Sequence, residues 1–370
     1  MRTRSVLVIN SGSSSVKFAL FQLTRTPVPL RRGTIDLGGA AFSPDRLLAS
    51  LSADVEDCPL GAIGHRIVHG GSLHTEPALL TDTVIADLER LVPLAPNHLP
   101  ASLALIDACR RARPDAPQIG CFDTAFHAAL PPESRRLPIP KALHDQGVRR
   151  YGFHGLAFTF LMQELRRVSP ERAHGRIVLA HLGNGSSLAA VHAGRSIDTT
   201  MGFTPLGGVV MGTRSGDLDP GVLVHLLRTT SRDADGLERL ISRDSGLAGI
   251  SGRSGDVKEL LAREADDPDC HLAVTIYCYE IRKRIGSFAA ALGGLDVLVF
   301  SGGVGEHAPS IRGRICGGLE FAGVRLDPAR NAGNDEVIST GDSPAMVRVI
   351  PANEEAVIAE AAHTLLHPGE

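Results

Sequence analysis

The stretch VLVINSGSSSVKFALF, residues 6–21, places a turn of small hydroxylated residues between two apolar segments, with one cation close behind. Ser13 and Ser15 provide hydroxyl groups, the turn provides backbone N–H groups, and Lys17 provides a positive charge. An oxyanion such as phosphate binds to groups of these kinds. The stretch is no P-loop, because no second glycine precedes Lys17 and the following residues alternate with the period of a strand. It predicts the tip of a β-hairpin, with a plain solvent-exposed turn as an equal alternative.

A second stretch, IVLAHLGNGSSLAAV at residues 177–191, repeats this design. Superposing Gly12 on Gly185, an offset of 173 residues, pairs the apolar segments and the serines of the two turns. An internal repeat at nearly half the chain length predicts two domains of common design. Two such hairpins would grip a nucleoside triphosphate tail from both sides, and chance similarity of two Gly/Ser hairpins is the alternative.

A third glycine cluster lies in VLVFSGGVGEHAPSIRGRI, residues 297–315. Gly303, Gly305 and Ala308 match the spacing of the dinucleotide fingerprint, but such a match alone is weak. About 65 residues follow it, too few for a full Rossmann domain. The glycines are better interpreted as allowing a ribose or a flat ring to approach the backbone.

Three charged residues have neighbours that are typical of an anion-binding or catalytic site. Arg66 and Arg214 are flanked by glycine or hydroxyl-bearing residues, and arginine binds carboxylate and phosphate oxygens with a planar fork. Asp123 ends an apolar segment, a common place for a catalytic carboxylate and equally for a helix cap. Taken alone, both arginines are better explained as structural ion-pair partners.

The elements that position these residues alternate between strands and helices, which predicts an α/β fold. Helix Glu354–Leu366 has Asn353 at its cap position and two glutamates in its first turn. The predicted strands are Val6–Ile9, Val16–Phe21, Ala62–Val68, Gln118–Phe122, Ile177–Leu182, Leu188–His192 and Val297–Phe300, and the other predicted helices are Val84–Leu91, Ala101–Ala112 and Leu272–Ala291.

Length and composition exclude several classes of protein. A chain of 370 residues exceeds what one hydrophobic core usually supports, so two domains are expected. The net charge of −3 argues against nucleic acid as a partner. The six cysteines show no CxxC spacing, which predicts reduced thiols in a cytoplasmic protein. No apolar run approaches the roughly 18 residues of a membrane span, so no membrane partner is expected.

The chain resembles the acetate kinase family, part of the superfamily of acetate and sugar kinases, heat-shock ATPases and actin. The resemblance covers almost the whole chain and rests on blocks in the family's order. It implies an α/β fold of two actin-like (ribonuclease H-like) domains related by an internal repeat, with a nucleotide in the interdomain cleft. Besides the two hairpins, the blocks are GHRIVHGG (64–71), FDTAFH (122–127), RRYGFHG (149–155), MGFTPLGGVVMGTRSGDLDPG (201–221), SGGVGEH (301–307) and PANEEAVIA (351–359).

The resemblance implies reversible, Mg²⁺-dependent transfer of the ATP γ-phosphoryl group to acetate by direct in-line displacement, giving acetyl phosphate and ADP; Mn²⁺ is a possible substitute for Mg²⁺. Because two anions must approach each other, the site has to supply positive charge. Arg66 would bind the acetate carboxylate, while Arg214 and His154 would stabilise the transferring phosphoryl group. The family assigns Asp123 an acid/base or positioning role. A short carboxylic acid, with a pKa of roughly 4–5, is already ionised near neutral pH, so we expect Asp123 to orient a metal-bound water or a neighbouring cation.

The other site residues follow from the same resemblance. The acyl pocket is implied at Val68, Asn97, Phe153 and Pro205, and the metal ligands at Asn10 and Glu354. The residues implied to bind ATP are Lys17, Ser13, Ser15, His181, Leu182, Gly183, Asn184, Gly185, Asp256, Val257, Lys258, Gly303, Val304, Gly305, Glu306 and His307.

Three of these positions depart from the family pattern. Asn97 stands where the family usually has leucine, and a polar side chain there would reduce the preference for a bare methyl group. Lys258 replaces an arginine and His307 an asparagine, which would loosen the choice of nucleotide. The preferred acid and nucleotide are therefore left open.

The predicted first domain comprises residues 1–125 with 355–370, and the second comprises residues 126–354, which the resemblance implies to form a homodimer. A kinase for propionate or another short acid is the alternative within the family. An ATP-gated clamp without catalysis, as in actin and the chaperones, is the alternative of another class. The paired arginines argue against the clamp.

Overall fold

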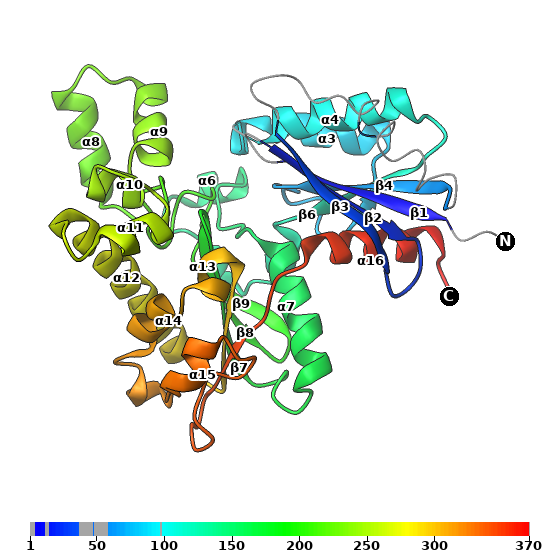
Figure 1. Ribbon diagram of the computed structural model, residues 1–370. Coiled ribbons are helices and arrows are strands. Elements are labelled where there is room, and N and C mark those ends of the chain that lie inside the picture. Colours follow the sequence, from blue (N-terminus) through cyan, green and yellow to red (C-terminus); the bar gives the residue numbers. More distant parts are fainter. Residues whose placement is uncertain (1–3, 12–14, 37–46, 48–57, 97, 370) are drawn as a thin grey trace. The chain divides into compact units, whose positions relative to one another are not determined.

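The computed structural model describes residues 4–11, 15–36, 47, 58–96 and 98–369, with the backbone alone at residues 11, 15 and 36. The chain divides into two compact units (Figure 1). The predicted domain boundaries stay a prediction. Residues 153–160, which were expected in the second domain, belong to the first unit of the structure. That unit comprises Met1–Ala128, Phe153–Phe160 and Asn353–Glu370, and the second comprises Ala129–Gly152 and Leu161–Ala352.

The first unit is built on a six-stranded sheet in the order β3-β2-β1-β4-β6-β5. β1, β2 and β3 form an antiparallel meander, and β4 and β6 run parallel to β1, so that these three parallel strands end at one edge. The strands are β1 (Ser5–Ser11), β2 (Ser15–Gln22), β3 (Pro29–Asp36), β4 (Leu60–Ile67), β5 (Ala78–Leu79) and β6 (Gln118–Phe122). The helices are α3 (Asp82–Arg90), α4 (Leu99–Ala112) and α16 (Glu354–Leu366), with 3-10 turns η1 (Val92–Leu94) and η2 (Ala125–His127).

Helices cover both faces of this sheet, because successive strand residues point to opposite faces. Val6 and Val8 of β1 belong to the core cluster that contains Ile358 of α16, while Leu7 and Ile9 belong to the cluster that contains residues of α4. Figure 1 shows α16 against one face of the sheet and α3 and α4 against the other. The resulting three-layer arrangement fixes the edge at which the parallel strands end.

The second unit contains a five-stranded sheet in the order β11-β10-β7-β8-β9. Its strands are β7 (Arg176–Leu182), β8 (Ser186–His192), β9 (Arg195–Thr199), β10 (Val297–Ser301) and β11 (Met346–Val349). Its helices are α5 (Pro132–Arg135), α6 (Lys141–Asp145), α8 (Pro220–Thr229), α9 (Ala234–Arg243), α10 (Gly246–Ser251), α11 (Val257–Arg263), α12 (Pro268–Leu292), α13 (Gly302–His307), α14 (Pro309–Cys316) and α15 (Pro328–Gly333), with the 3-10 turn η3 (Glu320–Ala322). Helix α7 (Gly155–Val168) begins among residues of the first unit and ends among those of the second.

The core of the second unit lies between its sheet and α12. Val178 and Leu188 of the sheet share one apolar cluster with Tyr277 and Ile281 of this helix. Asp267 caps α12 by accepting hydrogen bonds from the first backbone N–H groups of the helix. The 25-residue helix is therefore a rigid support beneath the strands that carry the glycine-rich turns.

The predicted internal repeat is confirmed in the strand order. In the second unit β7, β8 and β9 form an antiparallel meander, and β10 and β11 continue the sheet in parallel beyond β7, as β4 and β6 do beyond β1. Gly12 lies outside the described residues, so its superposition on Gly185 stays a prediction. No single offset matches both strands of the two hairpins, because the paired residues Ser11 and Val16 are five positions apart and Leu182 and Ser186 are four.

All of the predicted strands and helices are present, with ends shifted by a few residues. The predicted cap of α16 is confirmed, because the Asn353 side chain accepts a hydrogen bond from the backbone N–H of Ala356 at 3.3 Å. Among the helices formed by the described residues, none has the length and apolarity to cross a membrane.

Candidate active site

Four polar side chains come together at the edge of the first sheet where the parallel strands end. Asn10 lies on β1, Arg66 on β4, Asp123 directly after β6, and Glu354 at the start of α16. Arg66 Nη2 donates to Asp123 Oδ2 at 2.6 Å, and Nε lies 3.1 and 3.2 Å from the two carboxylate oxygens. Arg66 Nη1 donates to Asn10 Oδ1 at 3.1 Å, and Asn10 Nδ2 donates to Glu354 Oε2 at 3.2 Å. Two predicted catalytic residues thus lie beside both predicted metal ligands.

The Arg66 guanidinium keeps capacity for a ligand. Of its five N–H groups, three point to Asp123 and Asn10, and among the described residues the other two, one on each terminal nitrogen, make no hydrogen bond. The side chain is 19% exposed, so the guanidinium is accessible. A carboxylate or phosphate can accept from these N–H groups.

The Asp123 carboxyl group is almost fully enclosed, at 1% exposure. The pKa of Asp123 is raised to about 6, because burial and the nearby charge of Glu354 together outweigh the lowering by Arg66. Burial alone would lower the pKa of Arg66, but Asp123 and Glu354 outweigh burial and hold it above its ordinary value. When ionised, the cluster of one guanidinium and two carboxylates carries a surplus negative charge.

The oxygen atoms of this cluster fit a magnesium ion. Asn10 Oδ1 and the Glu354 carboxylate are hard oxygen donors, and Mg²⁺ needs few protein ligands because it retains water and phosphate oxygens. A divalent cation would also balance the surplus negative charge. The described residues contain no cluster of three or more His, Cys, Asp or Glu side chains suited to a metal.

The loop before α7 is fixed to Asp123 through its backbone. Gly155 N donates to Asp123 O at 2.8 Å, and a Cβ atom on Gly155 would lie 2.2 Å from that oxygen, so glycine is required. His154 adopts a left-handed backbone with φ of 59°, rare for a residue with a side chain and concentrated at functional sites. His127 Nε2 donates to Phe153 O at 3.2 Å and anchors the preceding residue.

Two of the predicted acyl-pocket residues, Val68 and Phe153 of the first unit, are apolar and enclosed. Val68 is 7% and Phe153 1% exposed, and the His69 ring contacts the Phe153 ring edge to face at 5.6 Å between centroids. Asn97 and Ser13 lie outside the described residues, and Ser15 is described by its backbone on β2. Lys17 is exposed, and its backbone pairs with Asn10, which places the two side chains on one face of the sheet.

In the second unit, Arg214 lies beside Pro205, which the resemblance assigns to the acyl pocket. Arg214 Nη1 donates to Pro205 O at 3.1 Å and contacts Met211 Sδ at 3.7 Å. A Cβ atom on Gly246, whose φ is +63°, would lie within 2.8 Å of backbone atoms of Arg214, so a close backbone contact holds this residue.

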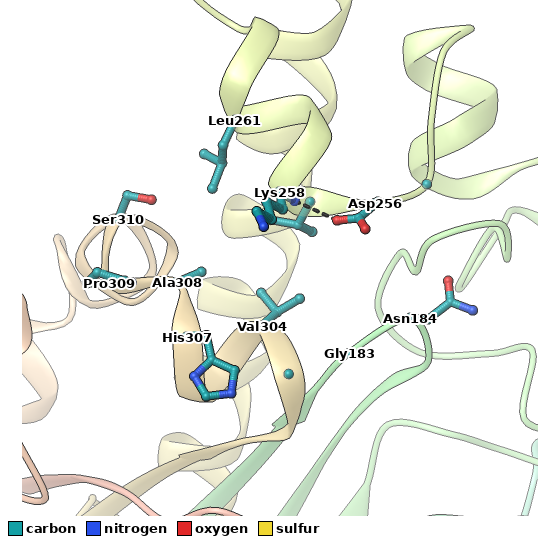
Figure 2. A pocket seen from close by; sticks show the side chains of 13 residues that line it. Gly183, Asn184, Asp256, Lys258, Leu261, Val304, His307, Ala308, Pro309 and Ser310 are labelled. Atoms are coloured by element: carbon teal, nitrogen blue, oxygen red, sulfur yellow. Dashed lines mark hydrogen bonds between the residues drawn. The ribbon is translucent and has the colours of Figure 1, made fainter. Parts of the chain in front are cut away.

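A pocket of about 800 Å³ in the second unit contains half of the residues predicted to bind the nucleotide. Val304 of α13 faces Lys258 and Leu261 of α11 across it (Figure 2). Asp256 accepts from Lys258 N at 2.7 Å and caps α11. The apolar side chains suit the faces of a flat ring, while Asp256 and Lys258 provide polar groups at the rim. The lining residues are Gly183, Asn184, Gly255, Asp256, Val257, Lys258, Leu261, Gly303, Val304, His307, Ala308, Pro309 and Ser310.

Five residues of this lining escape sequence reasoning. Leu261 is one helical turn beyond Lys258, and Ala308, Pro309 and Ser310 continue directly from the glycine cluster, so helical spacing and chain continuity would have found these four. Gly255 directly precedes the predicted residues Asp256, Val257 and Lys258, so chain continuity would have found it as well. The predicted residues His181, Leu182, Gly185, Gly305 and Glu306 do not line the pocket.

Glu306 has a structural partner for its carboxylate. One oxygen accepts from Gly302 N at 2.8 Å and from Ala352 N at 3.2 Å, with the Ser301 hydroxyl at 3.4 Å. Leu182 is fully buried in the core cluster, so its backbone alone can reach a ligand. Glu306 therefore fixes the backbone of Gly302, and Leu182 anchors the end of the strand that precedes the turn at 183–185.

Comparison with known proteins identifies the family of the chain. Residues 45–360 match the model of the acetokinase family. The chain belongs to the acetokinase family. It is 41% identical to an acetate kinase of Methylocella silvestris over 98% of both chains, and 43% identical to one of Rhodopseudomonas palustris over 96% of both.

Solved members of the acetokinase family share the fold. A crystal structure of Porphyromonas gingivalis acetate kinase matches with a TM-score of 0.90 and 37% identity over 98% of this chain and 100% of that one. A propionate kinase from Francisella tularensis matches with a TM-score of 0.88 and 32% identity over 97% and 98% of the two chains. The predicted family and the predicted α/β actin-like fold are confirmed, and as an acetokinase-family member the chain is a kinase.

Proposed function

We propose that this chain transfers the γ-phosphoryl group of ATP reversibly to acetate, giving acetyl phosphate and ADP. The observation that supports the proposal is the Arg66 cluster. Among the described residues, no acceptor binds the second N–H on each terminal nitrogen of this guanidinium, which Asp123 and Asn10 hold at the sheet edge where an anionic substrate can bind. The acetate kinases that this chain matches over almost their full length support acetate as the acceptor.

On the acceptor side, Arg66 binds the acetate carboxylate and lowers the repulsion between the two reacting anions. Asp123 holds the fork of Arg66 by accepting from Nε and Nη2, so it acts through that cation. No general base is required, because acetate is ionised at neutral pH. The family resemblance assigns Val68, Asn97, Phe153 and Pro205 to the pocket for the methyl group.

On the donor side, the nucleotide binds in the pocket of the second unit. The adenine ring lies between the apolar side chains of α11 and α13, and the free oxygen of Asp256 accepts from the ribose hydroxyls. The turn at 183–185 contacts the phosphates, with His181 beside it. Lys17, Ser13 and Ser15 of the first hairpin are assigned to the same phosphates.

The transferring phosphoryl group passes in line from ADP to the carboxylate, and fixed positive charge lowers the barrier. Arg214 and His154 are assigned to this charge. The strained backbone of His154 supports a functional position for its ring. Asn10 and Glu354 hold a Mg²⁺ ion, which when bound neutralises phosphate charge.

The test measures acyl phosphate directly. The purified chain is incubated with Mg-ATP, hydroxylamine and acetate, propionate or butyrate, and hydroxamate is quantified. We expect product with acetate, and at least a tenfold higher KM for acetate in Arg66→Lys, because lysine lacks the fork. Arg176→Lys is the matched control. Arg176 Nη2 donates to Asp296 Oδ1 at 2.6 Å in the second unit, and neither residue belongs to the Arg66 cluster. Absence of hydroxamate with every acid would refute the proposal.

The structural match to a propionate kinase makes propionate the second candidate acceptor. The two differ by one methylene group in an apolar pocket, a difference worth about 1–3 kcal/mol in selectivity. The ratio of kcat/KM for acetate and propionate decides between them. A ratio above ten favours acetate, and a ratio below one favours propionate.

We further infer a homodimer formed through the second unit. Leu272 and Tyr279, seven residues apart on α12, are 49% and 54% exposed. Gly286 continues this stripe, and a Cβ atom there would lie 3.6 Å from the ring of Phe321, which is 77% exposed. Contiguous exposed apolar surface is typical of protein interfaces. Exposed apolar side chains also occur on α8, at Val222, Val224 and Leu227.

We assign the protein to the cytoplasm. All six cysteines lie within the described residues, and each is a buried free thiol. Free thiols are typical of reducing compartments, where ATP is also available.

A further inference from the structure

The turn at 183–185 is held by two buried hydroxyl groups, those of Ser186 and Tyr277. Ser186, at the start of β8, is fully buried, so its hydroxyl cannot contact a nucleotide. Ser186 Oγ donates to Gly183 O at 3.1 Å, accepts from Gly183 N at 3.3 Å, and lies 3.0 Å from the hydroxyl oxygen of Tyr277. Ser186 therefore connects Gly183, the first residue of the turn, to Tyr277, which lies 91 positions after the serine.

The direction of these hydrogen bonds follows from the number of hydrogens. A serine hydroxyl has one hydrogen, and Gly183 O can only accept it. The Tyr277 hydroxyl therefore donates to Ser186 Oγ, and the Ser186 hydroxyl donates to Gly183 O. The result is a chain of two hydrogen bonds from α12 to the turn.

Tyr277 has no other function evident at its place in the fold. Its ring is fully buried in the core between α12 and the sheet, and a buried phenol hydroxyl needs a partner. A phenylalanine would fill the same volume without that need. Through Ser186 the hydroxyl is connected to the turn at 183–185, whose Gly183 lines the pocket close to Gly303, since a Cβ atom on Gly183 would lie 4.0 Å from Gly303 N.

We propose that Tyr277 is a positioning residue for the nucleotide, fixing the turn at 183–185 through Ser186. The inference rests on the proposed function, because it takes the pocket as the nucleotide site. The hydroxyl pair pre-orders the backbone N–H groups of the turn, so that binding a phosphate costs less ordering. Its effect should fall on the phosphates and spare the nucleoside.

The experiment compares Tyr277→Phe with wild type in the full-length chain. We expect the Kd for Mg-ADP, measured by calorimetry, to rise about fivefold, the effect of one neutral hydrogen bond. The Kd for adenosine, measured by competition, should stay unchanged. The KM for ATP should rise with it, and the KM for acetate should not. Thr364→Val, which removes an exposed hydroxyl from α16, is the matched control and should behave as wild type.

Ser186→Ala tests the same connection from the other side, and keeps the proposal testable if Tyr277→Phe folds poorly. The double variant should lose little more than Ser186→Ala alone, because both changes interrupt one chain of hydrogen bonds. An unchanged Kd for Mg-ADP in Tyr277→Phe, or equal losses for Mg-ADP and adenosine, would overturn the inference. A wild-type chain that binds neither ligand would overturn the proposed function, and the inference with it.

Discussion

At the scale of single residues, the electrostatic balance around Asp123 determines how the first unit responds to pH. The folded-state pKa of about 6 lies above the ordinary value of 3.8 because the carboxyl is buried. Between these values the native chain binds more protons than the unfolded chain, so stability falls as the pH rises. The contribution is complete below pH 4 and is lost as the pH passes 6.

This balance predicts a pH-dependent stability difference between wild type and Asp123→Asn. From pH 4 to pH 7 the wild type should lose up to about 3 kcal/mol of unfolding free energy relative to the variant. Urea titrations of both proteins at several pH values measure the difference. Asp115→Asn is the contrasting control, because a hydrogen bond from Arg113 lowers the pKa of Asp115 and reverses the sign. Parallel curves for wild type and Asp123→Asn would contradict the prediction.

A variant of Asp123 distinguishes a positioning role of this residue from a role as a catalytic base. Asp123→Asn should reduce kcat/KM for acetate by at least about tenfold, because the Arg66 fork loses its charged acceptor. The loss should persist from pH 7 to pH 9, since no proton has to leave the substrate. Hydroxamate assays across this range measure it. Recovery of activity at the alkaline end would instead support a catalytic base.

At the scale of elements, Arg312 on α14 holds the end of α13 in place. It is fully buried, and its five N–H groups all have acceptors. Nη1 donates to Gly305 O and Glu306 O at 2.9 and 3.0 Å, which fixes the helix that forms one wall of the pocket. The remaining donors reach the Asn331 side chain and carbonyl, and Asn334 Oδ1 at 2.6 Å, on α15 and at its end.

Replacing this side chain should be costly. Arg312→Lys retains the charge but loses the fork and two N–H groups, leaving buried carbonyls without donors. We expect a loss of at least about 2 kcal/mol, measured by urea unfolding. Arg314→Lys, two residues along the same helix, changes a partly exposed pair with Glu264 and should cost at most about 1 kcal/mol. Equal effects of the two substitutions would show that the buried acceptors contribute little.

Elements with one apolar face were predictable from the sequence, and those without one were not. Strand β3 has the sequence PLRRGTID and lies at the edge of its sheet, with most side chains exposed. It has no alternating pattern because neither of its faces is deeply buried. Helix α8 contains no buried residue. Helix α9 also contains none, but Leu237, Leu240 and Ile241 recur at helical spacing, so this helix could have been found from its sequence.

The candidate site shows the same division. Its glycine-rich turns are local motifs and could be found by eye. The contacts of Arg66 with Asp123 and Asn10 span 57 and 56 residues, and no local spacing indicates them. Spatial pairing across parallel strands brings these residues together, so the family resemblance was needed to select them.

At the scale of the whole molecule, the exposed stripe on α12 predicts the assembly. Phe321→Ser should weaken the proposed homodimer without unfolding the chain, because the ring is largely exposed. Sedimentation velocity over a range of concentrations should show dissociation of the variant where wild type stays dimeric. Leu73→Ser, at a 71% exposed site of the first unit, is the matched control. A monomeric wild type would contradict the dimer.

The placement of the cysteines has a practical consequence for measuring how the molecule opens. Three of them, Cys58, Cys109 and Cys121, belong to the first unit, and Cys270, Cys278 and Cys316 belong to the second. Burial raises the pKa of Cys121 to about 12 and that of Cys278 to about 11, which further slows alkylation in the folded chain. Timed exposure to an alkylating reagent, followed by mass spectrometry of the peptides, therefore measures the rate of opening of each unit separately.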